Sequence, residues 1–173
     1  MQSPMPKALG VPAIRLQRPL KVPPVPAFAA LKEILSGIAA QEGAWSGFAL
    51  HVALGDLHLP DVGYIAIPVA LTTGETHADL RSIDLQFSSA NNAASFPRFT
   101  GAAGIDTTGP TGSILWLAGD YDVPLHAVGR LFDKTLASGV ADRALENLIE
   151  DLAVALVANV EKREAEYVRY RLY

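Results

Sequence analysis

The sequence predicts an α+β domain in which helices lie on one side of a strongly curved antiparallel sheet. Within residues 140–160, large apolar side chains recur at steps of three and four, which marks one face of an α-helix: Leu145, Leu148, Ile149, Leu152, Leu156 and Val160. Five strand-like stretches joined by short turns precede this helix, and short connections favour antiparallel neighbours. A one-sided helix needs an apolar surface, so we expect it to pack on the sheet.

The first 26 residues contain seven of the twelve prolines of the chain. Proline fixes φ and lacks an amide hydrogen, so we expect residues 1–26 to form a proline-rich arm without helix or interior strand. Residues 13–17 fit a short edge strand, and they fit an extended arm on the surface at least as well. We expect residues 27–173 to form a single domain.

After the arm, the sequence predicts one helix, five strands and the long helix. The first helix spans 28–41 on an apolar stripe, with Ser36-Gly37 as a possible break. Five segments show either alternating apolar residues or a short apolar run, and each is predicted to be a strand: 48–54, 65–71, 83–88, 96–106 and 113–121. Pro68 requires an edge or a bulge in the second of these, and residues 72–76 are expected to form a loop.

We expect the long helix to begin at Leu125, after a turn at residues 122–124. Its second side carries charged and amide residues and is expected to face solvent. The tail at 161–173 mixes charges with three tyrosines. Continuation of the helix through this tail is the preferred interpretation, and docking of the tail on a second subunit is the alternative.

Composition restricts the function classes. The 173 residues suffice for one domain with a full core. Half of them are apolar, so we expect the surplus to line a cavity or cover a subunit interface, yet no apolar run reaches the roughly 18 residues of a membrane span. The net charge is −4, with basic residues scattered, which argues against nucleic-acid binding. There is no cysteine and no signal-peptide pattern at the start, so a cytoplasmic protein is expected.

The order of elements, together with the join from Gly119 to Arg130 (GDYDVPLHAVGR), resembles the START-like, or SRPBCC, superfamily. Residues 96–101 and 113–121 look like the penultimate and last strands of that family. The resemblance covers about residues 27–160 and implies a helix-grip fold, in which a bent antiparallel sheet wraps the C-terminal helix and leaves an apolar pocket. The sequence departs from the family at its front, where a clear first strand is missing.

A pocket of this kind needs large side chains on the concave face of the sheet and on the facing helix. For its lining we expect Phe87, Phe99, Leu115, Leu117, Tyr121, Val128, Leu131, Phe132 and Leu136. Ordinary close packing without a cavity has the same sequence pattern. Both interpretations stay open, with the apolar surplus and the resemblance favouring the pocket.

The sequence contains no motif specific to catalysis. Candidate acid–base residues are Asp84, Arg98, Asp120 and Tyr121, and strict alternation turns both aspartates away from the apolar side of their strands. The four histidines have no metal-ligand spacing, and no phosphate-binding or dinucleotide-binding loop is present. We therefore expect no metal and no cofactor.

Three hypotheses for the function follow. The first is binding of a hydrophobic small molecule or lipid between the sheet and the C-terminal helix, without catalysis. The second, implied by the resemblance, is an enzyme like a polyketide cyclase or dehydratase that uses an acid–base residue in the same cavity. The third is a homodimeric interaction protein, which would use an apolar sheet face or the proline-rich arm.

Overall fold

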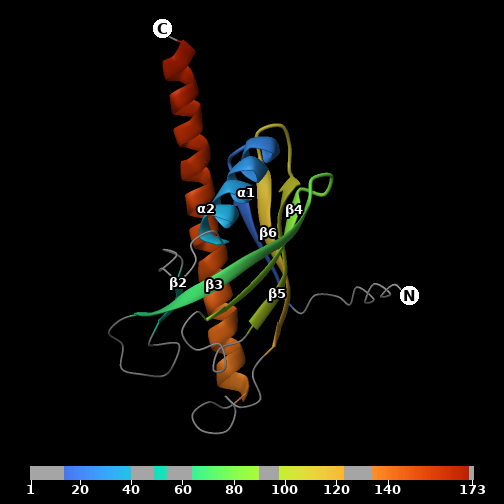
Figure 1. Ribbon diagram of the computed structural model, residues 1–173, viewed down its shortest axis with the longest axis vertical. Helices are drawn as coiled ribbons and strands as arrows, with labels where there is room; N and C mark the ends of the chain where they lie inside the picture. The colour runs from blue at the N-terminus through green and yellow to red at the C-terminus, as the bar shows by residue number, and fades with distance from the viewer. Residues whose placement is uncertain (1–13, 40–48, 54–63, 90–97, 123–133, 172–173) are drawn as a thin grey trace, which may run out of the picture.

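The computed structural model describes residues 14–39, 49–53, 64–89, 98–122 and 134–171 (Figure 1). Six strands form one sheet in the order β1-β6-β5-β4-β3-β2, and every neighbouring pair is antiparallel. The elements in chain order are β1 (Ile14–Leu20), α1 (Pro24–Ala39), β2 (Ala49–Ala53), β3 (Tyr64–His77), β4 (Ser82–Ser89), β5 (Arg98–Thr107), β6 (Ser113–Asp122) and α2 (Lys134–Arg171). Figure 1 shows α1 and the long α2 on the same side of the sheet. The predicted α+β helix-grip fold is confirmed.

The N-terminal part of the chain supplies an edge strand. β1 pairs with β6 from Ile14 opposite Gly119 to Leu20 opposite Ser113, so the surface-arm alternative is wrong for these residues. Pro19 is tolerated here because an edge strand has one side without ladder hydrogen bonds. The division of the chain at residue 26 stays a prediction.

The first helix begins earlier than the sequence indicated. α1 starts at Pro24 and runs without a break through Gly37, so the expectation that residues 1–26 contain no helix is wrong for its last three residues. The first amide groups of a helix have no intrahelical acceptor, so the missing donors of Pro24 and Pro26 cost little there. The amide of Ala27 donates to the carbonyl of Pro23 at 3.1 Å.

β3 is longer than predicted and lies inside the sheet. It continues through residues 72–76, which the sequence indicated as a loop, and its register to β4 shifts between Thr73 and Thr76. Pro68 pairs with Ala49 of β2, and the described ladder to β4 begins at Val69. β3 as a whole lies between β4 and β2, and its register irregularity falls between Thr73 and Thr76. The residue that would pair with Pro68 on the β4 side lies outside the described residues, so an edge or bulge at Pro68 stays a prediction.

The predicted contact between α2 and the sheet is confirmed. The apolar stripe of α2 is buried in one cluster with side chains from β1, β4, β5, β6 and α1: its members are Leu145, Leu148, Ile149, Leu152, Leu156 and Val160. Two ion pairs at the surface also join α2 to its neighbours: Arg18 of β1 pairs with Glu150 at 2.6 Å, and Arg163 pairs with Glu33 of α1. The helix continues through the tail to Arg171, as preferred from the sequence.

Within the described ranges, no helix is both long enough and apolar enough to cross a membrane.

Candidate ligand-binding site

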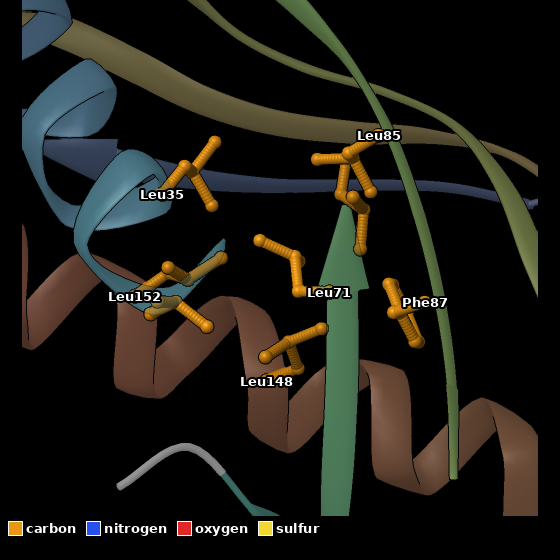
Figure 2. A pocket seen from close by; sticks show the side chains of 8 residues that line it. Leu35, Leu71, Leu85, Phe87, Leu148 and Leu152 are labelled. Atoms are coloured by element: carbon orange, nitrogen blue, oxygen red, sulfur yellow. The ribbon is translucent and has the colours of Figure 1, made fainter. Parts of the chain in front are cut away.

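An apolar cavity lies where the sheet and both helices meet. Its volume is about 20 Å³, enough for about one water molecule. Eight side chains line it, from α1, from the sheet and from α2 (Figure 2): Leu35, Ile38, Leu71, Leu85, Phe87, Leu117, Leu148 and Leu152. The lining side chains among the described residues are all hydrocarbon, so this part of the wall offers a guest dispersion contacts and no hydrogen bond.

Successive side chains of a strand point to opposite faces of the sheet, and this alternation brings the sheet residues of the cavity wall to the helix side. Leu85 and Phe87 of β4 are buried on the helix side, while Asp84 and Gln86 between them are exposed. Among the eight described lining residues, seven are buried and only Leu71 is partly exposed. The rim of the cavity therefore lies at Leu71 on β3.

A row of aromatic side chains extends across three adjacent strands from the cavity wall. Phe87 lies opposite Phe99 and Phe99 lies opposite Tyr121 on three adjacent strands, and the rings of Phe87 and Phe99 stack with centroids 4.7 Å apart and planes at 15°. A glycine pair makes room for this stack. Gly101 and Gly119 face each other, and a Cβ added to either would lie 2.9 Å or less from the ring of Phe99.

The row ends in a polar pair that joins β6 to α2. The hydroxyl of Tyr121 forms a hydrogen bond with the Asp142 carboxylate, and burial, followed by the charge and hydrogen bond of Asp142, raises the pKa of Tyr121 above its ordinary value. Tyr121 is partly buried against the core cluster. At neutral pH Tyr121 therefore keeps its proton and donates a hydrogen bond to Asp142.

The other acid–base candidates lie away from the cavity. Asp84, Arg98 and Asp120 are exposed, so Tyr121 alone among the four candidates faces the helices. Asp84 lies 3.4 Å from the Nε2 atom of His77 on the outer side of the β3–β4 hairpin. In the part of the chain that the structure describes, no group of three or more His, Asp or Glu side chains is arranged to hold a metal ion.

Two of the nine predicted lining residues, Phe87 and Leu117, line the cavity. Phe99 stacks on Phe87, Tyr121 follows in the same row, and Leu115 is fully buried in the adjoining core. Val128, Leu131 and Phe132 lie outside the described residues. Leu136 belongs to α2, but its side chain is likewise outside the description.

Sequence reasoning did not assign six residues to the cavity: Leu35, Ile38, Leu71, Leu85, Leu148 and Leu152. Each of them was part of an apolar stripe or strand recognised in the sequence. The pattern that marks such residues as buried does not separate those beside a cavity from those in close packing.

The similarity of this chain to known proteins is limited to its architecture. No protein-family model and no curated protein sequence matches the chain. Among solved structures, similar ones include the Zhui aromatase/cyclase from Streptomyces sp. R1128 (15% identity, TM-score 0.47, covering 90% of this chain and 94% of that one). Norcoclaurine synthase from Thalictrum flavum, in complex with dopamine and hydroxybenzaldehyde, has 11% identity, a TM-score of 0.43, and coverage of 87% and 98%.

A protein from Thermus thermophilus has 16% identity and a TM-score of 0.47, with coverage of 87% of this chain and 97% of that one. These neighbours are helix-grip proteins of the superfamily that the sequence resembles. With TM-scores below 0.5, these similarities assign neither a ligand nor a reaction to this chain.

Proposed function

We propose that this protein binds a small apolar molecule in the cavity between its sheet and its two helices. The observation that carries the proposal is the composition of the described part of the wall: eight side chains from three separate parts of the fold converge on one space, and all of them are hydrocarbon. Transfer of apolar surface from water into such a site releases roughly 25 cal/mol per Å². A polar guest would lose its hydrogen bonds to water without replacement.

The small volume of the cavity limits how a guest can bind. A cavity of about 20 Å³ is far smaller than the roughly 300 Å³ at which drug-sized pockets begin. A larger guest therefore requires movement of lining side chains. Leu71 is the one lining residue among those described that is only partly buried, so its displacement costs less packing than that of the others, and we expect a guest to enter beside it.

The test uses N-phenyl-1-naphthylamine, an uncharged dye whose fluorescence rises in apolar surroundings. We expect saturable binding to the folded wild type and an affinity at least tenfold lower in Leu71→Trp, where an indole fills the rim. Leu80→Trp is the matched control, because Leu80 is 66% exposed and lies outside the cavity wall. Absence of saturable binding to folded wild type, or an equal loss in both variants, would overturn the proposal.

One observation favours a second candidate, an acid–base enzyme of the cyclase or dehydratase type. Tyr121 stands on the helix side of the sheet at the end of the aromatic row, protonated and hydrogen-bonded to Asp142. In the dehydration of a β-hydroxyketone, the Asp142 carboxylate would take the proton from the carbon beside the carbonyl group. The Tyr121 phenol would turn from Asp142 to the leaving hydroxyl group and donate its proton to it, so that water departs as the C=C bond forms. The test is dehydration of a β-hydroxyketone probe: it should proceed with wild type and stop in Tyr121→Phe, while dye binding stays unchanged.

A further inference from the structure

The helix α2 has an exposed face on the side away from the sheet. Before Val154 this side carries charged and polar residues, Arg143, Asn147, Glu150 and Asp151. From Val154 onward the composition changes, and we define the outer face of α2 as Val154, Ala158, Glu161, Lys162, Ala165, Val168 and Arg169, all of them exposed. Val154 and Val168 are 64% and 57% exposed, unusual for valines on a helix that already buries another apolar stripe.

The spacing of this face is typical of helix pairing. Its apolar members and Glu161 follow steps of four and three: Val154, Ala158, Glu161, Ala165 and Val168. This is the 3.5-residue repeat with which helices pack against each other. In Figure 1 the C-terminal end of α2 extends beyond the sheet and α1, and residues 161–170 are all exposed, so the domain leaves this segment accessible to another helix.

The charges of the outer face are self-complementary in one register. A two-fold axis passing between Glu161 and Lys162 would place each Glu161 opposite the Lys162 of a second, antiparallel copy. The same register places Ala158 opposite Ala165, where two methyl groups permit close approach of the helices. Val154 then lies against the aliphatic stem of Arg169. The paired segment, residues 154–169, would be about 24 Å long at 1.5 Å per residue.

We propose that two copies of this chain associate through the outer face of α2, as an antiparallel helix pair about this two-fold axis. The reciprocal charges favour a second copy over an unrelated partner, because in a two-fold interface every contact occurs twice and one residue pair supplies two ion pairs. The interface lies on the opposite side of α2 from the cavity. The proposal is therefore independent of what the cavity binds.

A charge exchange tests the partner and the register. Glu161→Lys and Lys162→Glu each convert both ion pairs into like-charge contacts, and we expect each to raise the dimer dissociation constant at least tenfold. The double variant, Glu161→Lys with Lys162→Glu, restores both pairs and should restore dimerisation. Glu164→Lys is the matched control, since it makes the same charge change on an exposed helix position outside the outer face.

Light scattering across a dilution series provides the measurement, with masses of 18.4 kDa and twice that value to be distinguished. A wild type that is monomeric up to its solubility limit would overturn the proposal, as would single variants that dimerise like wild type. Circular dichroism of each variant confirms that the fold is intact.

Cross-linking tests the antiparallel geometry separately. The chain contains no cysteine, so a variant with Ala158→Cys and Ala165→Cys carries only the two introduced thiols. These lie seven residues apart on one helix, about 10 Å, too far for a disulfide within the chain. We expect mild oxidation to give a covalent dimer in the double variant and not in either single variant. A single variant that cross-links as fast as the double would overturn the register.

Discussion

The same substitution, glycine to alanine, should have opposite effects at two positions. At Gly101, a Cβ would lie 2.2 Å from the carbonyl oxygen of Ala118 and 2.7 Å from the Cα of Gly119. Both atoms belong to backbone held in the β5–β6 ladder, so the strands would have to separate, at a cost of about 1–3 kcal/mol. At Gly37, an exposed position in α1, a Cβ meets no atom within 4 Å. Alanine there should gain about 0.5–1 kcal/mol from helix propensity.

Urea unfolding followed by circular dichroism measures both effects. With a slope of about 2 kcal/mol per M, Gly101→Ala should lower the midpoint by about 1 M and Gly37→Ala should raise it by about 0.4 M. The difference in sign is the decisive result, because both variants add one methyl group to the same protein. If Gly101→Ala is as stable as wild type, the close approach of β5 and β6 at this position is not a constraint and the reasoning fails.

Three further predictions concern buried contacts. Phe99→Ala should lower the free energy of unfolding by about 3–5 kcal/mol in the same assay, because the Phe99 side chain is only 1% exposed and its ring stacks on Phe87. A loss below about 1 kcal/mol would contradict this packing. Ser113→Ala should cost about 1–2 kcal/mol, because the buried hydroxyl donates to the carbonyl of Val22 at 2.9 Å; Thr111→Ala, at an exposed position two residues away, is the control. The raised pKa of Tyr121 means that the unfolded chain loses this proton first as the pH rises. Stability should therefore be unaffected below about pH 10 and fall above it, and Tyr121→Phe should flatten that alkaline decline; an unchanged decline would show that Tyr121 does not cause it.

Elements with strong periodicity were predictable because their patterns reflect direct contact with the core. The stripe of α2 and the alternation in β4 and β6 place each side chain on the face where the structure has it. β1 could not be decided, since Pro19 excludes an interior strand but fits both an edge strand and a surface arm. The extension of β3 through Gly74 was missed because Thr72-Thr-Gly-Glu-Thr has loop composition, while pairing with β4 supplies the hydrogen bonds that keep it extended.

The site was harder to predict than the fold for a physical reason. Whether a buried leucine lines a cavity depends on the distance between elements, and no local pattern encodes that distance. Leu35 of α1 and Leu152 of α2 lie 117 positions apart in the sequence and border the same space. Tyr121, in contrast, could be placed on the helix side by counting from Leu115 and Leu117 in steps of two.

The proposed binding and the stability of the fold would depend on the same side chains. Leu148 and Leu152 hold α2 against the sheet and also line the cavity. Enlarging the cavity by truncating either of them would cost about 2–5 kcal/mol, a large part of the roughly 5–15 kcal/mol by which a domain is stable. Space for a guest can therefore be gained at the lowest cost where the wall is already partly open, at Leu71. In proteins of this arrangement we therefore expect ligand size to vary with the residue at the β3 rim, while the leucines of the long helix stay large.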